Sequence, residues 1–310
     1  MTPFPPAATE AEFARLTRAG LLPPVRTLLG SLGVRGEPEP FADGSLPVYA
    51  VGADLVLKLF PPVHLGELPT ERTMLEALHG RLPIPTPRVV QAGEHEGWGY
   101  VLMDRLPGVT LKEAWPQLST EDKAALAPRL GEALAALHGL DDPALTVLGP
   151  ANWSAFLTGQ RDRALDHHRA TNLDEHWLAQ IPAFLDAVDL GEPATVPLHT
   201  EFMRDHLMVT PGSGEPTGLF DFEPAMRGAA EYEFVAVGLF VSGGDAAFLH
   251  RLLLAYGYHP ADLGEEFARR CLAYALLHVY SDFRWYLDAL PAPPEPTLDA
   301  LATAWWGTAG

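Results

Sequence analysis

Short apolar runs separated by turn residues dominate the first hundred residues. The runs at 46–51 and 55–60 are rich in valine and leucine, and a glycine-containing turn at 52–54 separates them. This pattern predicts two antiparallel strands joined by a tight turn. A second pair of strands is predicted at 88–92 and 98–104, again with glycines between them.

Helical spacing of apolar residues interrupts these strands. Met74, Leu75 and Leu78 share one face of a helix predicted over 70–79. An earlier helix is expected at 9–18, where a threonine can cap the first turn. The order strand, strand, helix, strand, strand indicates a small β-rich lobe.

Beyond residue 107 the pattern becomes helical. Ser119 begins an amphipathic stretch that runs to His138, and Pro128 inside it is expected to kink or split the helix. A short β-rich insertion is expected at 196–222. Further helices are predicted at 153–170, 173–188, 231–241, 244–256, 261–290 and 297–306.

A small β-rich lobe followed by a larger helical lobe is an α+β, two-lobed design. We place the lobes at 1–104 and 105–310, because the pattern changes near residues 105–108. A length of 310 residues with 47% hydrophobic residues suits one large or two medium globular domains.

The formal net charge is −19. Such acidity repels the phosphates of nucleic acids and anionic membranes, so neither partner is expected. The acidity either attracts a cationic substrate or serves only solubility. The composition gives no indication of the oligomeric state.

Three features predict a cytoplasmic protein. The first ten residues lack the basic start and apolar core of a signal peptide. The apolar runs near 234–241 and 271–280 are too short to span a bilayer. The single cysteine, Cys271, excludes an intrachain disulfide, which fits a reducing compartment.

Lys58 is the only lysine in the first hundred residues and lies inside an apolar strand. A charge there needs an acidic partner or an anionic ligand, unless the side chain faces solvent. Glu71 in the following predicted helix is one candidate partner, and Glu76 is the alternative.

Two further ionisable clusters lie in the β-rich insertion. The segment 198–209 places Glu201 and His206 between two apolar strands, and Asp221 ends another strand. The alternative interpretation of the first cluster is an ordinary polar hairpin. The alternative for Asp221 is a helix cap or a salt bridge to Arg204 or Arg227. Together with Lys58, however, the order of lysine, helix acid, loop acid and strand-end aspartate is typical of phosphoryl transfer. In that chemistry the lysine holds phosphate, while carboxylates hold metal and orient a hydroxyl.

These residues resemble the aminoglycoside phosphotransferase family, a branch of the protein-kinase-like fold, over roughly 48–286. The resemblance begins with the strand lysine Lys58, the helix acid Glu71 and a hinge-like segment at 99–108. It continues with Leu137-His138, Asp221-Phe222, Gly228 and Glu233.

The resemblance implies roles for these positions. Lys58 would contact the α- and β-phosphates of ATP or GTP and pair with Glu71. Asp221 would ligate Mg²⁺, and His206 stands where the family has its second metal ligand. The backbone of the hinge, at Asp104, Arg105 and Leu106, would read the adenine edge. Gly44-Ser45 is the best match to a glycine-rich phosphate loop, and Glu233 would buttress a catalytic loop behind which His199 packs.

The catalytic loop departs from the family pattern, which reads His-Gly-Asp with an asparagine five residues after the aspartate. This chain has Glu201 as the base and His206 in place of the asparagine. The extra methylene displaces the carboxylate by about 1 Å, which can cost on the order of a hundredfold in rate. Imidazole also suits Mg²⁺ badly. Three alternatives follow: Glu201 still acts as base or orients the hydroxyl, His206 becomes the base, or nucleotide binds without transfer.

The predicted function is therefore an ATP- and Mg²⁺-dependent phosphotransferase acting on a hydroxyl of a small, aminoglycoside-like or other metabolite. The alternative is a nucleotide-binding pseudokinase with a sensor or scaffold role. Asp282 and Asp288, near Trp285, either belong to an acceptor cleft or form a solvated helix surface. The histidines at 167, 168 and 176 match no zinc spacing, and helix surface is expected there.

Overall fold

The computed structural model describes residues 2–308, and the chain divides into two compact units. The first unit consists of Met1–Pro107 and Thr217–Pro224, and the second of Gly108–Pro216 and Ala225–Gly310. Met1, the first of the ten residues in which no signal peptide is expected, lies outside the described residues. The segment Thr217–Pro224 belongs to the first unit, although the sequence assigns the whole of 105–310 to the helical lobe.

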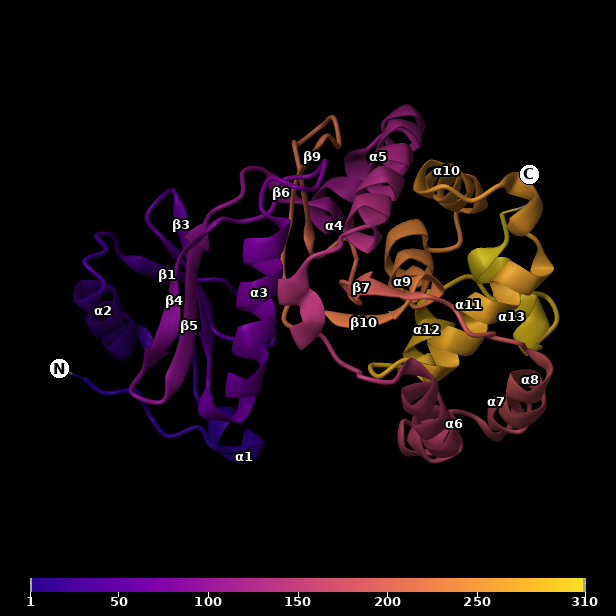
Figure 1. The fold of residues 1–310 in the computed structure, drawn as a ribbon, viewed down its shortest axis with the longest axis horizontal. Coiled ribbons are helices and arrows are strands. Elements are labelled where there is room, and N and C mark those ends of the chain that lie inside the picture. The colour runs from indigo at the N-terminus through magenta and orange to yellow at the C-terminus, as the bar shows by residue number, and fades with distance from the viewer. Residues whose placement is uncertain (1, 309–310) are drawn as a thin grey trace. The chain divides into compact units, whose positions relative to one another are not determined.

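A five-stranded sheet in the order β1-β2-β3-β5-β4 forms the centre of the first unit (Figure 1). Strand β3 pairs antiparallel with β2 and with β5, which places Lys58 opposite Val48 on one side and Val101 on the other. The four predicted strands are confirmed. The strands are β1 (Pro38–Pro40), β2 (Val48–Val51), β3 (Leu55–Phe60), β4 (Val89–His95) and β5 (Trp98–Asp104).

Helices cover both faces of this sheet (Figure 1). The predicted helix with Met74, Leu75 and Leu78 on its buried face is α3 (Leu68–Leu78). The helix expected at 9–18 is much shorter, because α1 covers only Glu10–Phe13, although Thr9 caps it as predicted. Helix α2 (Leu22–Ser31) was not predicted.

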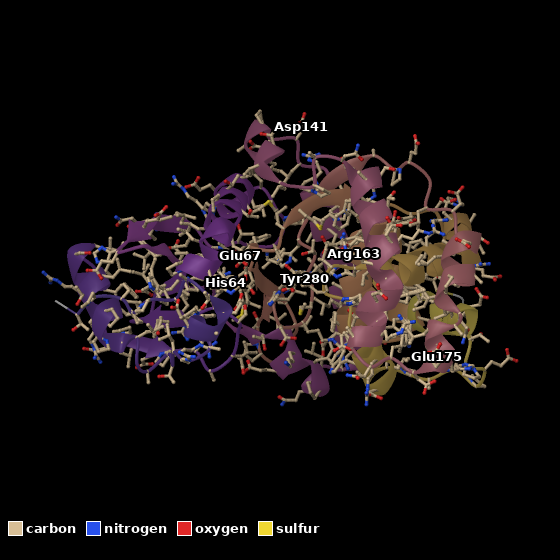
Figure 2. All side chains as sticks on the ribbon, turned by 90° about the horizontal axis from the view of Figure 1, so that it is seen from below. His64, Glu67, Asp141, Arg163, Glu175 and Tyr280 are labelled. Carbon is tan, nitrogen blue, oxygen red and sulfur yellow. The ribbon has the colours of Figure 1, made fainter. Side chains whose placement is uncertain are left out.

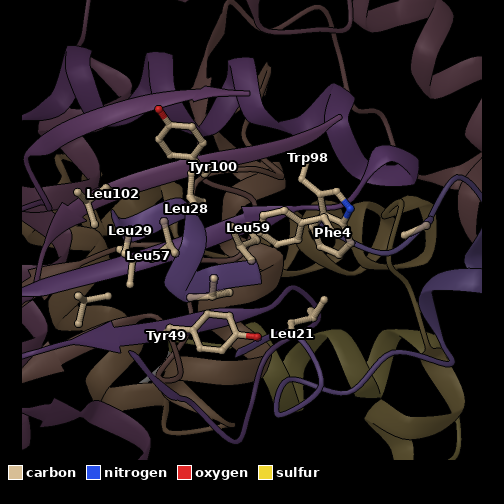
Figure 3. Packing of buried hydrophobic residues seen from close by; sticks show 13 residues of the cluster. Phe4, Leu21, Leu28, Leu29, Tyr49, Leu57, Leu59, Trp98, Tyr100 and Leu102 are labelled. Atoms are coloured by element: carbon tan, nitrogen blue, oxygen red, sulfur yellow. The ribbon is translucent and has the colours of Figure 1, made fainter. Parts of the chain in front are cut away.

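The core of the first unit lies between the sheet and α2 (Figure 3). Leu57 and Leu59 of β3 point into it, so the period of two places Lys58 on the opposite face of the sheet. Phe4 also joins this core and stacks on Trp98 with ring centroids 5.0 Å apart. The sheet therefore separates a hydrophobic core on one face from the lysine on the other.

The second unit is mainly helical, with short strands between the helices. Exposed charged residues such as Asp141, Arg163 and Glu175 cover its surface (Figure 2). Within residues 2–308, none of the helices combines the length and apolarity that crossing a membrane requires. The helices are α4 (Leu111–Ala114), α5 (Thr120–His138), α6 (Trp153–Ala170), α7 (Glu175–Leu178), α8 (Ile181–Ala187), α9 (Ala230–Ala236), α10 (Ala246–Tyr256), α11 (Glu265–Leu277), α12 (Phe283–Ala289) and α13 (Leu298–Trp306).

Short strands position the loops of the second unit. Strand β7 pairs with β10, and β6 pairs with β8, both antiparallel. The β-rich insertion predicted at 196–222 is confirmed, whereas β10 was not predicted. The strands of this unit are β6 (Val109–Thr110), β7 (Thr195–Leu198), β8 (Leu207–Val209) and β10 (Met226–Ala229). Strand β9 (Pro216–Leu219) lies, except for its first residue, in the segment that belongs to the first unit.

Three helix predictions need correction. Pro128 does not split α5, whose first turn is held by a capping box of Ser119 and Asp122. The helix expected at 173–188 is two helices, α7 and α8, with a proline in the first turn of α8. The helix expected at 261–290 breaks after α11, and α12 begins only at Phe283. This break, residues 278–282, contributes to a cavity described below.

Candidate functional site

Lys58 lies at the centre of a cluster of three carboxylates in the first unit. Its Nζ is 3.2 Å from Glu71 Oε2, 2.6 Å from Asp221 Oδ1 and 2.5 Å from Glu223 Oε2. Lys58 and Glu71 are almost completely buried. The predicted contact between Lys58 and Glu71 is present, whereas the alternative partner, Glu76, pairs with Arg72 at 2.8 Å. The solvent-facing interpretation of Lys58 is therefore wrong.

Local structure holds the members of this cluster in place. Helix α3 brings Glu71 over the sheet, and Glu71 Oε2 also accepts the backbone N–H of Phe222 at 2.7 Å. The N–H of Leu219 donates to the carbonyl of Pro85 at 2.9 Å, which ties the segment 217–224 to the rest of the first unit. Asp221 has a φ of 76°, a left-handed conformation that non-glycine residues adopt mainly under a local constraint.

The charges of the cluster do not balance. Burial would lower the pKa of Lys58, but Asp221, Glu71 and Glu223 outweigh it and raise that pKa well above its ordinary value. Burial, with Asp221 and Glu71, also raises the pKa of Glu223 to about 8 despite the nearby lysine. One ammonium thus faces three carboxyl groups, and the cluster has room for additional positive charge.

The chemistry of the donor set fits a hard divalent cation. Carboxylate oxygens of Glu71, Asp221 and Glu223 all lie within 4.8 Å of one another. Oxygen donors of this kind suit Mg²⁺, which is bound in proteins by carboxylates, water and phosphates. Sequence reasoning missed Glu223. The available signal was its spacing of two from Asp221, which places alternate side chains on one side of an extended segment.

The hinge residues use part of their backbone hydrogen-bonding capacity internally. The N–H of Asp104 donates to the Arg88 carbonyl at 3.0 Å, and that of Arg105 donates to the Asp54 carbonyl at 2.7 Å. The Asp104 carboxylate in turn accepts two bonds from the Arg88 guanidinium, at 3.0 and 3.1 Å. Among residues 2–308, no partner is seen for the N–H of Leu106. Leu106 is therefore the hinge residue whose backbone donor is still available for a ligand.

One arginine holds the loop between β1 and β2, which contains Gly44-Ser45. The Arg18 guanidinium donates to the carbonyls of Ala42 and Asp43, each at 3.1 Å, and to that of Gly44. A longer bond of 3.4 Å reaches Leu46. With its carbonyl groups turned toward Arg18, the loop is held in one conformation. Sequence reasoning did not identify Arg18.

In the second unit, a buried carboxylate supports the loop between β7 and β8. Glu233 Oε2 accepts the backbone N–H of His199 at 2.6 Å and that of Thr200 at 3.2 Å. Burial would raise the pKa of Glu233, but His138, His199 and the Thr200 N–H outweigh it and lower that pKa. Thr200 has a φ of 70°, so these bonds hold a backbone conformation that threonine rarely adopts.

Glu201 and His206 lie together in this loop. His206 Nδ1 is 3.0 Å from the Glu201 carbonyl oxygen and 3.9 Å from Glu201 Oε2. The rings of His199 and His206 stack with centroids 5.9 Å apart. The histidine therefore packs inside the loop and lies close to the glutamate that the family resemblance makes the base.

A cavity of about 270 Å³ in the second unit begins at the same loop. Phe240 stacks on Trp285 with ring centroids 5.6 Å apart, and His278 from the break after α11 also lines the cavity. Asp288 is exposed and is not among the lining residues. We call this the aromatic cavity, and its defining residues are Glu201, Phe240, Tyr280, Asp282, Trp285 and Tyr286.

The three histidines first considered for a zinc site, His167, His168 and His176, contact backbone carbonyls. His168 is buried, with Nε2 2.9 Å from the Leu276 carbonyl, rather than on a helix surface as expected. His167 Nε2 lies 2.6 Å from the Ser281 carbonyl. His176 Nε2 lies 2.7 Å from the Pro296 carbonyl. Each ring therefore contacts a backbone carbonyl, which ties helices to neighbouring segments and does not build a metal site.

Several known proteins are similar to this chain in sequence or in fold. An aminoglycoside 3'-phosphotransferase from Streptomyces fradiae is 28% identical over 162 residues, which are 50% of this chain and 58% of that protein. The chain thus spans less than two thirds of that relative. The structure of the GDP complex of wild-type aminoglycoside 2'-phosphotransferase-IIIa has a TM-score of 0.71 at 17% identity, covering 86% of this chain and 95% of its own. The structure of aminoglycoside phosphotransferase APH(3'')-Id from Streptomyces rimosus has a TM-score of 0.57 at 19% identity. That similarity covers 83% of this chain and 98% of the other.

These structural similarities confirm the predicted fold, with a β-sheet lobe and a helical lobe as in kinase-like phosphotransferases. A family model described as the phosphotransferase enzyme family matches residues 37–271. The match begins just before β1 and continues into α11, so it includes the Lys58 cluster and the loop with Glu201. The chain therefore belongs to the phosphotransferase enzyme family.

Proposed function

We propose that this protein is an ATP- and Mg²⁺-dependent phosphotransferase that acts on a hydroxyl of a small, aminoglycoside-like or other metabolite. The observation that carries the proposal is the Lys58 cluster, in which one buried lysine meets three carboxylates. A lysine and carboxylates together suit a triphosphate with its divalent cation. GTP remains the alternative nucleotide, because GDP occupies a similar structure and ATP another.

The first unit holds the nucleotide in this proposal. Lys58 contacts the α- and β-phosphates, and the N–H of Leu106 reads the base. Asp221 and Glu223 hold Mg²⁺, with Glu71 positioning Lys58 and the strand end. When bound, Mg²⁺ neutralises charge on the transferring phosphoryl group. His206, also predicted as a metal ligand, offers a nitrogen donor that Mg²⁺ disfavours.

The second unit orients the acceptor. Glu201 accepts the proton of the acceptor hydroxyl, and the hydroxyl oxygen forms a bond to the γ-phosphorus of the nucleotide. The bond from that phosphorus to the β–γ bridging oxygen breaks, which releases the nucleoside diphosphate. Glu233 acts as a positioning residue, because it holds the backbone of the Glu201 loop through His199 and Thr200. His206 is the alternative base, since the pKa of an ordinary histidine lies near 6.5.

A pseudokinase is the second candidate function, and the unusual loop favours it. Glu201 and His206 replace the aspartate and asparagine of the family pattern, which a catalytically inactive relative can tolerate. In that case nucleotide binding would stabilise the protein without turnover. A cytoplasmic location, where ATP is abundant, is part of both proposals.

Asp221→Asn tests the proposed function. The substitution keeps the size of the side chain and removes a charge next to Lys58. The rate of phosphate transfer from ATP to an acceptor panel, including kanamycin and streptomycin, should fall at least a hundredfold. Adding Mg²⁺ should also no longer increase the rise in melting temperature that the nucleotide causes. Nucleotide stabilisation of the unaltered protein without transfer to any acceptor would support the pseudokinase instead.

A further inference from the structure

A second cavity, of about 640 Å³, lies in the first unit. Its volume falls within the range of small-molecule sites, which is roughly 300–1,000 Å³. One wall comes from the end of α1 and the residues that follow it, and the other from the end of β1 and the β1–β2 loop. We call this the N-terminal cavity, and its defining residues are Phe13, Leu16, Arg18, Phe41, Ser45 and Pro47.

The apolar wall of the N-terminal cavity lies on the sheet face opposite to Lys58. Phe13 and Leu16 pack against the hydrophobic core of the first unit, and Leu21, which also lines the cavity, belongs to that core. Leu57 of β3 points into the same core, whereas the neighbouring Lys58 points to the other face (Leu21 and Leu57 are labelled in Figure 3). The cavity is therefore separate from the Lys58 cluster and from the proposed site of the nucleotide phosphates.

Arg18 is the one charged side chain among the described residues that line this cavity. Within residues 2–308 the hydrogen bonds of its guanidinium all go to neutral backbone carbonyls, and its buried Nε–H has no acceptor. Carbonyl oxygens satisfy N–H donors but do not neutralise a charge. The cavity therefore presents a positive charge that no carboxylate of its described lining balances, in a chain whose formal net charge is −19. Such a charge attracts a small anion.

The charge and the walls together define the class of anion. A carboxylate carries one negative charge and two acceptor oxygens that match a guanidinium. A phosphate group carries almost two charges, and the described lining residues offer no second cation. Phe13, Leu16 and Phe41 provide apolar surface for the rest of the molecule, which favours an aromatic ring or an alkyl chain over a polar body.

We propose that the N-terminal cavity binds a small monocarboxylate with an aromatic or alkyl body, and that this ligand strengthens nucleotide binding by stabilising the β1–β2 loop. The carboxylate contacts the Arg18 guanidinium, and the apolar body lies between the two walls. The binding of the carboxylate does not depend on the proposed function. The effect on the nucleotide rests on the proposed function, since it requires the nucleotide site of the first unit.

Two contacts connect the cavity with the proposed nucleotide site. The Arg18 guanidinium holds the carbonyls of Ala42 and Asp43 in the β1–β2 loop, each at 3.1 Å. The centroid of the Phe41 ring lies 5.8 Å from Arg105 Cζ, at the hinge. A ligand that fills the cavity touches both walls and favours the loop conformation in which they face each other. Nucleotide binding to the same conformation is strengthened, and the nucleotide in turn strengthens carboxylate binding by the same factor.

Ala14→Phe is the variant that blocks the cavity. Ala14 is exposed and lines the cavity, so a phenyl ring there occupies its volume without displacing a core residue. Ala11→Phe is the matched control, because Ala11 is an exposed alanine of α1 that is not among the lining residues. Arg18→Gln removes the positive charge but keeps a polar side chain with N–H donors. Melting temperatures verify that each variant is folded, and if one of the two site variants does not fold, the other decides.

Calorimetric titration of the nucleotide-free protein measures binding, with phenylbutyrate and octanoate as the probes. Phenylbutyramide has the same body without the charge, and acetate has the charge without the body. We expect the two probes to bind at least tenfold more tightly than the amide and acetate. Arg18→Gln should weaken binding at least tenfold, Ala14→Phe should abolish it, and Ala11→Phe should leave it unchanged. Absence of binding by both probes, equal binding of the amide, or unchanged binding in Ala14→Phe would overturn the site.

The effect on the nucleotide is measured as the Kd of a non-hydrolysable ATP analogue with Mg²⁺, in the presence and absence of saturating phenylbutyrate. The carboxylate should lower this Kd about fivefold in the unaltered protein and in Ala11→Phe, and should have no effect in Ala14→Phe. An unchanged or raised Kd in the unaltered protein would overturn the coupling. A protein that binds phenylbutyrate but no nucleotide would contradict the proposed function and the coupling, and would retain the carboxylate site.

Discussion

Glu71 and Phe222 are joined by a hydrogen bond although 151 residues separate them: Glu71 Oε2 accepts the Phe222 N–H at 2.7 Å. The same oxygen lies 3.2 Å from Lys58 Nζ. Glu71 therefore orients the lysine and also fixes the backbone next to Asp221. A glutamate with two such partners is more than a counter-ion for one lysine.

We expect Glu71→Ala to destabilise the protein more than Glu71→Gln. Alanine removes the carboxylate that accepts the buried Phe222 N–H, and the loss of such a buried bond costs about 1–3 kcal/mol of unfolding free energy. Glutamine retains a carbonyl oxygen for that N–H, and Lys58 keeps Asp221 and Glu223 as partners. Urea unfolding of both variants measures the difference, and equal losses would show that the bond to Phe222 contributes little.

Arg18→Ala should weaken nucleotide binding more than it weakens the fold. The substitution releases the carbonyls of Ala42, Asp43 and Gly44, so the β1–β2 loop loses its single conformation. We expect the KM for ATP to rise about five- to tenfold, corresponding to roughly 1–1.4 kcal/mol, with little change in kcat.

Arg26→Ala is the control for Arg18→Ala. Arg26 forms an exposed pair with Glu37 in the same unit, and such pairs contribute at most about 1 kcal/mol. A similar KM in the Arg18 and Arg26 variants would mean that the loop does not need the Arg18 guanidinium. Arg18→Lys should be intermediate, because one ammonium cannot reach all of these carbonyls.

Glu201→Asp restores the carboxylate found in the family pattern but retracts it by about 1 Å. Because the aromatic cavity and the loop are built around glutamate, we expect kcat to fall ten- to a hundredfold with a nearly unchanged KM for the acceptor. Steady-state kinetics measure kcat and the KM for the acceptor in both proteins. A higher kcat in the variant would instead indicate that glutamate at this position lowers the rate of transfer.

His278 should make stability depend on pH below neutrality. Burial lowers its pKa to about 4, below the ordinary 6.5, so the unfolded chain takes up the proton first and stability falls as the pH is lowered from about 6.5 to 4. Between pH 7 and pH 4.5 this amounts to about 2–3 kcal/mol.

His278→Phe isolates that contribution, since phenylalanine retains a ring against Tyr232, where the present ring centroids are 4.5 Å apart. Unfolding free energies from urea titrations at the two pH values should differ less in the variant than in the unaltered protein. Parallel pH profiles would show that His278 titrates normally.

Local patterns allowed much of the fold to be predicted. Apolar runs bounded by turn residues marked β3 and β5, and helical spacing of apolar residues marked α3. The Pro-Glu-Pro strand β1 gave no such period and is an edge strand, where prolines are tolerated. Helix α2 was missed because its prolines resemble a loop, although they occupy the first turn.

The candidate site was predicted less completely than the fold. Lys58 and Asp221 could be identified because the first interrupts an apolar strand and the second ends one. Glu71 was one of two candidate acids in the following helix, and the family resemblance favoured it over Glu76. Glu223 was missed although its spacing of two from Asp221 offered a signal, because a single acid after a strand looks like a solvated residue until its contact with Lys58 is seen. The break at 278–282 was hidden for a related reason, since the apolar run continues into it without glycine or proline.

The route of the chain through the first unit has a consequence for how the protein is made. The segment Thr217–Pro224 supplies Asp221 and Glu223, yet more than a hundred residues of the second unit are synthesised between it and Pro107. During translation Lys58 therefore has Glu71 as its only partner from this cluster until residue 224 has left the ribosome. An N-terminal fragment ending near residue 107 would contain the five-stranded sheet and Lys58. It would lack Asp221 and Glu223, two of the three carboxylates that contact this lysine.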